Sequence, residues 1–160
     1  IGLLTALILK SYGVKMQVLE TNLARHPCVK EHVGIEAINP ITQTLSSNNF
    51  DIVIDCVGSE KTSSLSFETI KTGGVIINVG LQNWTSSINI RKLTLEEIKL
   101  IGCYTYSMED FKSALKTIES GKFGNLSWIK ELPLSDANLA FRQLHDDRMS
   151  SAKVILKPHL

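Results

Sequence analysis

The segment 50–57, with the sequence FDIVIDCV, is the feature that most restricts what this chain can fold into. Apart from two aspartates it is apolar, and a near-continuous apolar run of this length is typical of a parallel strand that is covered on both faces. Gly58 ends the run. Because each parallel strand needs a crossover that covers the sheet, the segment predicts helices before and after it.

Strand-like and helix-like segments alternate along the first half of the chain. Gly13 and Gly34 follow two helical patterns, and Asn39-Pro40 stops a short strand. This alternation is typical of a doubly wound α/β sheet with parallel strands, which is the predicted fold class. The expected elements are helices at 2–12, 22–33, 41–46 and 61–72 and strands at 15–19, 36–38, 50–57 and 75–79.

The second half of the chain has longer amphipathic patterns and fewer strands. One helical pattern is followed by Gly121, and another is preceded by Ser135 as a plausible N-cap. Pro158 stops a last strand. The expected elements are an edge strand at 88–90, a strand at 98–105, helices at 108–120 and 135–145, and a strand at 152–156.

The charge of the chain excludes several partners. Its 17 basic and 16 acidic side chains nearly cancel, with no run of five like charges, so neither nucleic acid nor an anionic membrane is implied. The apolar stretches break before the roughly 18 residues of a spanning helix. We expect a cytoplasmic protein, and 160 residues suit one domain. The chain reads as a piece of something longer, and any targeting segment would be lost with the missing N-terminus.

The cysteines do not form an obvious framework. Cys28, Cys56 and Cys103 are odd in number and far apart, so we expect reduced, buried thiols. Cys28 and His32 stand four positions apart, but no second pair of ligand residues follows, so we expect no zinc site within this chain.

Three conspicuous side chains are expected to be structural. Asp55 lies inside a parallel strand, where hydrogen bonding to the backbone is a more common role than acting as a base. Trp84 and Trp128 are far apart, with no basic residues interleaved, so we expect packing residues and no stacking platform.

The first twenty residues carry the clearest binding pattern. An apolar helix starts at Gly2, and the short strand after it ends at Glu20, eighteen positions later, close to the spacing in βαβ units that bind dinucleotides. Of the three glycines in the fingerprint G-x-G-x-x-G, only Gly2 can be present. The N–H groups of Gly2 and Leu3 would meet a pyrophosphate. Glu20 would accept both ribose hydroxyls and repel a 2′-phosphate, which favours NAD over NADP.

Segments along nearly the whole chain resemble the medium-chain zinc-dependent alcohol and polyol dehydrogenases. Each motif is weak by itself, but they occur in the order of that family. The matching segments are IGLLTA at 1–6, FDIVIDCVG at 50–58, INVG at 77–80, LTLEEIKLIG at 93–102, Phe111, Ala114, ESGK at 119–122, LPL at 132–134 and AKVIL at 152–156.

The resemblance implies an oxidoreductase that passes hydride between an alcohol and nicotinamide. Residues 1–107 would be an incomplete, Rossmann-like dinucleotide-binding domain that lacks its first strand, and residues 108–160 would return to the catalytic domain. The zinc ligands of the family match nothing here, so we expect no catalytic residue and no metal in this chain, and no turnover by it alone. In the family, the strand near 98–105 also pairs across a dimer axis, which implies a homodimer.

The remaining cofactor-binding candidates follow from the resemblance and from the rule that open α/β sheets bind ligands at the carboxyl ends of their strands. Thr21 is a weak neighbour of Glu20. Arg25 matches a basic position near the ribose, where it would shield Glu20 or tolerate a phosphate. The others are Cys56, Val57 and Gly58 on the adenine side, Val79, Gly80 and Leu81 under the nicotinamide, Tyr104 and Thr105 at the next strand end, and Lys153 near the phosphates.

Two other functions stay open at this point. A methyltransferase that binds S-adenosylmethionine also uses a glycine turn and a strand-end acid, and it would have a reversed final hairpin in its sheet. A non-enzymatic NAD-binding module is the third possibility. Binding of NAD or of S-adenosylmethionine would distinguish the dehydrogenase from the methyltransferase.

The absence of a first strand has a structural consequence. In the usual strand order a central member would be missing and two facing edges would be unpaired, although buried backbone groups need partners. We expect the gap to be filled by residues 152–156, by a strand from another copy, or by residues outside this sequence.

Overall fold

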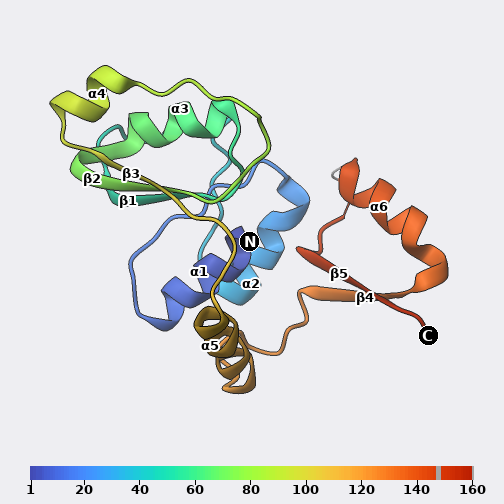
Figure 1. Cartoon of the computed structure of the whole chain (residues 1–160). Coiled ribbons are helices and arrows are strands. Elements are labelled where there is room, and N and C mark those ends of the chain that lie inside the picture. The colour runs from blue at the N-terminus through green and yellow to red at the C-terminus, as the bar shows by residue number, and fades with distance from the viewer. Residues whose placement is uncertain (147–148, 160) are drawn as a thin grey trace. The chain divides into compact units, whose positions relative to one another are not determined.

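Three parallel strands form the sheet in the middle of the chain. The computed structural model describes residues 1–146 and 149–159. In it, β1 (Phe50–Asp55), β2 (Ile70–Asn78) and β3 (Lys99–Gly102) lie in the order β1-β2-β3, and both pairs are parallel (Figure 1). The predicted α/β class with a parallel sheet is confirmed. None of the described strands in this sheet runs in the reverse direction that a methyltransferase would require.

The described residues divide into two compact units. One consists of Ile1–Gln43 with Glu109–Leu160, and the other of Thr44–Met108, which contains the three-stranded sheet. Each unit has its own buried apolar cluster. No described helix is long and apolar enough to cross a lipid bilayer.

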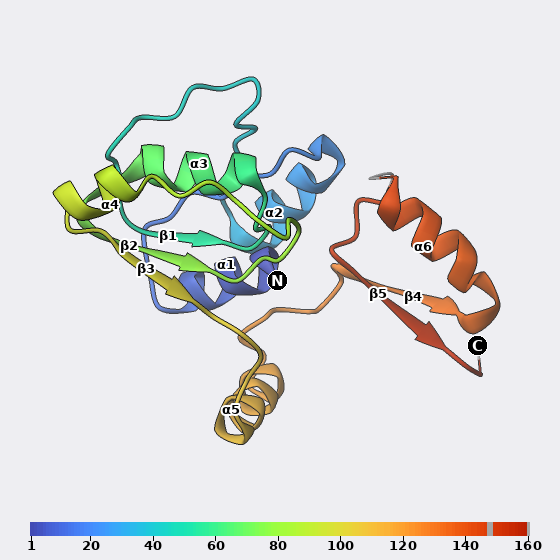
Figure 2. The same cartoon turned by 45° about the horizontal axis from the view of Figure 1, so that its top comes forward.

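Helix α3 (Glu60–Thr69) connects β1 to β2 and covers one face of the sheet (Figure 2). Phe67 on this helix packs against Ile76 of β2, and the two belong to one cluster with Ile70 and Ile98. Val53 of β1 packs against the same cluster. Alternation along the strands therefore directs Val53 and Ile76 toward the helix and buries them there.

Strand β2 begins five residues earlier than the sequence pattern predicts. Ile70 is fully buried and pairs with Phe50, and the register shifts between Phe50 and Ile52. The chain thus becomes extended at Ile70 and irregular up to Val75, so Gly73 and Gly74 are part of the strand. A β-bulge of this kind depends on the neighbouring strand and is not visible in a single sequence.

The predicted edge strand at 88–90 is wrong, because this segment leads into helix α4 (Ile90–Leu95). The side chain of Asn89 accepts a hydrogen bond from the N–H of Lys92 at 2.9 Å and caps the helix. An Asn side chain in this position favours a helix start.

The first unit begins with α1 (Gly2–Ser11), followed by the short 3₁₀-helix η1 (Leu23–Arg25) and α2 (His26–Val33). Pro27 stands in the first turn of α2, where its missing N–H costs little, and Gly34 ends the helix with a φ of 87°. The apolar cluster of this unit contains buried residues from α1, α2 and later segments, namely Ala6, Leu7, Val29, Val33, Ala37, Phe123 and Trp128.

The strands predicted at 15–19 and 36–38 are reduced to a single parallel bridge between Leu19 and Ile38. Two hydrogen bonds support it, from the N–H of Glu20 to the carbonyl of Ile38 at 3.0 Å and from the N–H of Ile38 to the carbonyl of Val18 at 2.9 Å. The two segments do run side by side as predicted. The ladder is short because the segment 36–38 has only three residues before Asn39-Pro40, and a proline cannot donate a ladder hydrogen bond.

The predicted helix at 41–46 is also wrong. Asn39 starts a turn there, because its side-chain oxygen accepts the N–H of Ile41 at 2.9 Å and its carbonyl accepts the N–H of Gln43 at 3.0 Å. Asn side chains that bond to nearby backbone in this way compete with helix formation.

The last part of the chain contains α5 (Met108–Glu119), β4 (Ile129–Pro133), the 3₁₀-helix η2 (Leu134–Asp136), α6 (Ala137–His145) and β5 (Lys153–Lys157). The sequence analysis missed β4, and β4 pairs with β5 in a separate parallel sheet of two strands. The expectation that 152–156 fills the gap beside β1 is therefore wrong. Ser135 is not the N-cap either, since it lies within η2 and Asp136 precedes α6.

The two tryptophans have different environments. Trp128 is buried in the apolar cluster of the first unit, as predicted, with 6% of its surface exposed. Trp84 is fully exposed, so its predicted packing role is wrong. It stands in the irregular segment that follows β2, where the described residues leave it in solvent.

Candidate functional site

Asp55, the last residue of β1, organises the turn that leads into α3. One carboxylate oxygen, Oδ1, accepts the N–H groups of Val57 and Gly58, both at 2.9 Å. The other, Oδ2, accepts the hydroxyl of Thr62 at 2.8 Å. Asp55 is buried, and these three hydrogen bonds compensate its lost hydration. The predicted structural hydrogen bonding of Asp55 is confirmed.

The segment after β2 is fixed to the same turn. The carbonyl of Asp55 accepts the N–H groups of Val79 at 2.9 Å and Gly80 at 3.0 Å. Farther on, the N–H of Gln82 donates to the carbonyl of Val57 at 3.0 Å. The residues at the ends of β1 and β2 thus form one continuous backbone surface, since they are joined by hydrogen bonds over several positions.

Gly58 and Gly80 allow these two segments to touch. A Cβ atom on Gly58 would lie 2.0 Å from the carbonyl oxygen of Gly80, and a Cβ on Gly80 would lie 2.0 Å from the carbonyl carbon of Val57. Gly58 also has a φ of 71°, which disfavours other residues. Both glycines are therefore required by packing of backbone against backbone, a role that the sequence did not reveal.

The end of β3 lies beside the same edge. The N–H of Cys103 donates to the carbonyl of Asn78 at 2.9 Å, which continues the pairing of Asn78 with Gly102. Tyr104 is 81% exposed, and Thr105 has a φ of 52°. The structure therefore brings eight predicted residues to the carboxyl edge of this sheet, namely Cys56, Val57, Gly58, Val79, Gly80, Leu81, Tyr104 and Thr105.

In the first unit, α1 begins at Gly2, as predicted. Ile1 precedes it without a side-chain cap, and the first intrahelical bond runs from the N–H of Thr5 to the carbonyl of Ile1 at 3.0 Å. The N–H groups of Gly2 and Leu3 therefore have no partner within the helix. They carry the partial positive charge of the helix terminus, and α1 has no acidic residue in its first turn.

Glu20 lies in a closely bonded loop that leads into α2. Its Oε1 accepts the N–H of Asn22 at 2.8 Å, and its Oε2 lies 3.8 Å from Nη1 of Arg25. The side chains of Glu20 and Arg25 are both about one quarter exposed, at 24% and 28%. Thr21 is exposed beside them. The predicted proximity of Arg25 to Glu20 is therefore present as an ion pair.

Lys153 belongs to the sheet of two strands. It is the first residue of β5, pairs in register with Ile129 of β4 and is exposed. The sheet to which it belongs contains only β4 and β5 among the described strands.

The described residues do not fit a zinc site. In residues 1–146 and 149–159, no three His, Cys, Asp or Glu side chains are grouped closely enough to hold a metal ion. On α2, Nε2 of His32 lies 3.5 Å from the Ser127 hydroxyl. Burial, and to a lesser degree Glu31, raise the pKa of the Cys28 thiol, which opposes the deprotonation that a zinc ligand needs. No step of a reaction is therefore derived through a metal in this chain.

The cysteines form no disulfide. Cys28 and Cys56 are half-buried, but Cys103 is exposed, so the expectation of three buried thiols is wrong for Cys103. Its position just after an edge strand explains the exposure, since no further strand covers it in the described structure.

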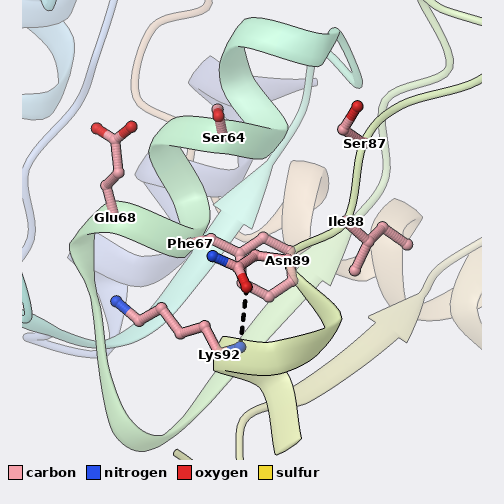
Figure 3. Close-up of a pocket in the computed structure, with 7 residues that line it drawn as sticks. All are labelled: Ser64, Phe67, Glu68, Ser87, Ile88, Asn89 and Lys92. Atoms are coloured by element: carbon pink, nitrogen blue, oxygen red, sulfur yellow. Dashed lines mark hydrogen bonds between the residues drawn. The ribbon is translucent and has the colours of Figure 1, made fainter.

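A hollow of about 280 Å³ lies between α3 and the start of α4 (Figure 3). Two of its polar side chains have partners already, because Asn89 caps α4 and Nζ of Lys92 donates to Oδ1 of Asn48 at 2.9 Å. None of the predicted cofactor residues lines it; the lining residues are Ser64, Phe67, Glu68, Ser87, Ile88, Asn89 and Lys92. We assign this hollow to the packing of the two helices.

Two parts of the described structure carry groups of the kind that bind nucleotides. The strand ends of the sheet present backbone with no side chain at Gly58 and Gly80, and the loop after the first bridge presents a carboxylate at Glu20. The sequence analysis missed two residues that shape these places, Thr62 and Asn22. Asn22 precedes η1 and accepts the N–H of Ala24 at 2.9 Å, so an N-cap signal was present in the sequence.

Among known proteins, the relatives of this chain include dehydrogenases. Sorbitol dehydrogenase 1 of Saccharomyces cerevisiae is 25% identical over 76% of this chain and 38% of that protein. The (R,R)-butanediol dehydrogenase of the same yeast is 25% identical over 99% of this chain and 46% of that protein. This chain therefore spans less than half the length of these relatives.

A solved structure has the same fold. The acetophenone reductase of Geotrichum candidum in complex with NAD superimposes with a TM-score of 0.86 at 19% identity, over 97% of this chain and 45% of that one. In addition, the sequence profile described as "Zinc-binding dehydrogenase" matches residues 1–120. From this match over three quarters of its length, the chain belongs to the zinc-binding dehydrogenase family.

Proposed function

We propose that this chain is the nicotinamide-dinucleotide-binding portion of an alcohol or polyol dehydrogenase. The observation that carries the proposal is the carboxylate of Glu20, which lies at the end of the segment after α1 and is held by the N–H of Asn22. A carboxylate at this position of a βαβ unit suits the adenosine ribose of NAD. The names of the curated relatives, which act on sorbitol and butanediol, suggest a small alcohol or polyol as the substrate of the whole protein.

In this proposal, each group of residues has a separate part in binding. The N–H groups of Gly2 and Leu3 bind the pyrophosphate, Glu20 and Thr21 bind the ribose hydroxyls, and Lys153 approaches the phosphates. At the sheet edge, Cys56, Val57 and Gly58 border the adenine side. Val79, Gly80, Leu81, Tyr104 and Thr105 border the nicotinamide side. When bound, the cofactor supplies the hydride acceptor of the reaction.

The domain assignment belongs to the same proposal. Residues 1–107 bind the dinucleotide, and residues 108–160 return to the part of the protein that carries the substrate and zinc. In this proposal the chain contributes no catalytic residue of its own, because the zinc ligands of the family match none of its residues. Binding and orientation of the cofactor are its contribution.

A preference for NAD over NADP follows from charge. A 2′-phosphate placed at the ribose would meet the Glu20 carboxylate, and the two negative charges would repel each other. Arg25 lies 3.8 Å from Glu20 and offsets part of this charge. To reach a phosphate, Arg25 would have to leave Glu20. We therefore propose that NAD is the cofactor and that Arg25 weakens the discrimination without reversing it.

Calorimetric titration of the chain tests the proposal. NAD should bind with one site per chain, NADP should bind more weakly, and S-adenosylmethionine should give no saturable heat. Glu20→Gln should reduce the difference between NAD and NADP, because the amide keeps the shape of the acid but removes its charge. Glu31→Gln on the exposed face of α2 is the matched control. Saturable binding of S-adenosylmethionine without NAD binding would contradict the proposal and support the methyltransferase.

We further propose that the protein is a homodimer through β3. All four residues of this edge strand are exposed, including the apolar pair Leu100 and Ile101. An exposed apolar edge strand is a ready place for pairing with a second copy. The order of the described strands leaves the outer edge of β3 unpaired within the sheet.

A further inference from the structure

His26 closes the loop that carries Glu20. Its ring atom Nε2 lies 2.8 Å from the main-chain oxygen of Glu20, and the residue is half-buried at the start of α2. A carbonyl oxygen can only accept a hydrogen bond, so Nε2 carries the proton and donates it. This contact joins the end of the 15–20 segment to the helix that follows.

Several other hydrogen bonds join residues within this loop. Glu20 Oε1 accepts the N–H of Asn22 at 2.8 Å, and Oδ1 of Asn22 accepts the N–H of Ala24 at 2.9 Å. The carbonyl of Asn22 accepts the N–H of Arg25 at 3.0 Å. These three bonds join residues two or three positions apart, and the ion pair of Arg25 with Glu20 is longer, at 3.8 Å. The bond from His26 to the Glu20 carbonyl spans six positions at 2.8 Å.

We propose that His26 is a positioning residue for the cofactor, a role that rests on the proposed function of Glu20 as the ribose-binding acid. Its bond to the Glu20 carbonyl fixes the backbone from which the carboxylate extends. A binding group held in one orientation before the ligand arrives loses less conformational entropy on binding. His26 thus acts through Glu20 and does not touch the dinucleotide itself.

This role differs from a general contribution to stability in what it predicts. If His26 only stabilised the fold, its loss would weaken NAD and NADP binding by the same factor. Because it orients the acid that separates the two cofactors, its loss should weaken NAD binding more than NADP binding. The ratio of the two dissociation constants is therefore the informative quantity.

The experiment is calorimetric titration of the whole chain with NAD and with NADP, for the unaltered protein and four variants. His26→Ala removes the donor. His26→Asn keeps a polar amide that is too short to reach the carbonyl, and serves if the alanine variant does not fold. His26→Gln restores a donor at the reach of Nε2. His145→Ala, at the exposed end of α6, is the matched control.

We expect His26→Ala and His26→Asn to weaken NAD binding by about 3- to 10-fold, the range for loss of one net hydrogen bond. The ratio of NADP to NAD dissociation constants should fall, His26→Gln should restore it, and His145→Ala should leave it unchanged. Unchanged NAD binding in both donor-lacking variants would overturn the inference, as would an equal loss for both cofactors. If the unaltered chain bound neither cofactor, the proposed function itself would fail and this inference with it.

Discussion

At the scale of single residues, Asp55 stabilises both the turn after β1 and the segment after β2. Its carboxylate accepts three hydrogen bonds, from Val57, Gly58 and Thr62, while its carbonyl accepts two more from the segment after β2. A buried carboxylate with this many donors is costly to remove, because each of its partners would be left without an acceptor. The residue is therefore structural although it lies at a candidate binding edge.

We predict that Asp55→Ala lowers the free energy of unfolding by about 2–4 kcal/mol, since two backbone N–H groups and a hydroxyl lose their partner. Asp51→Ala on the same strand is the control. Asp51 is exposed and pairs only with Lys71 at the surface, so its loss should change the free energy by less than about 1 kcal/mol. Urea denaturation measures both. Equal effects of the two substitutions would contradict the role given to Asp55.

Gly80 and Gly102 provide a second matched pair. A Cβ on Gly80 would lie 2.0 Å from backbone of Val57, whereas a Cβ on Gly102 would meet nothing within 4 Å. Gly80→Ala should therefore cost about 2–4 kcal/mol of stability, as for overpacking that backbone must relieve, and Gly102→Ala should be nearly neutral. Thermal unfolding of the two variants measures this difference, and a neutral Gly80→Ala would contradict the close contact.

The three cysteines should differ in reactivity. Cys103 is exposed, whereas burial and then Glu31 raise the pKa of half-buried Cys28. Because the thiolate is the nucleophile, iodoacetamide at pH 8 should label Cys103 before Cys28. Mass spectrometry of digested protein follows both sites. Labelling of Cys28 first would contradict these environments.

The raised pKa of Cys28 makes the free energy of unfolding depend on pH. A thiol whose pKa is higher in the folded state contributes stability while it is protonated in both states. That contribution is lost as the pH rises through the folded pKa. Replacing Cys28 by Ser should therefore flatten the decline of stability at alkaline pH, which urea denaturation at a series of pH values would detect.

At the scale of elements, the sequence predicts those strands and helices whose signals are local. The apolar run of β1 and the helices α1, α2, α3, α5 and α6 are found near their expected positions. Glycine-ended helices were especially well located, as Gly34 and Gly121 follow α2 and α5 with positive φ. These features depend on the chain's own conformational preferences.

Elements that depend on neighbours were predicted less well. The segment 15–19 forms only one bridge, β4 was missed because its sequence IKELP has no strand alternation, and β2 extends through a bulge. The candidate site shows the same difference. Glu20 and Gly2 were predicted from their spacing in the sequence, but the contact between Gly58 and Gly80 and the bond from His26 to Glu20 are visible only in the tertiary structure.

Edge strand β3 carries a prediction about assembly. Ile101→Glu places a charge on an exposed apolar position of β3 and should convert a homodimer to a monomer. Leu95→Glu, at an exposed position on α4, is the control and should leave the dimer intact. Light scattering coupled to size-exclusion chromatography gives the mass of each. A dimer that survives Ile101→Glu would contradict an interface through β3.

At the scale of the whole molecule, two kinds of observation agree on family and fold. A profile match over residues 1–120 establishes the zinc-binding dehydrogenase family, and a parallel α/β structure with a TM-score of 0.86 to an NAD-bound reductase supports the fold. The proposed role of this chain in binding the dinucleotide rests on this family membership.

The central claim is that this chain binds a nicotinamide dinucleotide through residues of its own. Amide chemical shifts of ¹⁵N-labelled protein during a titration with NAD test this most directly. The account predicts saturable shifts at Gly2, Leu3, Glu20, Gly58 and Gly80, and none around the hollow at Asn89. Shifts confined to the residues of that hollow, or no saturable shifts in a folded chain, would contradict it.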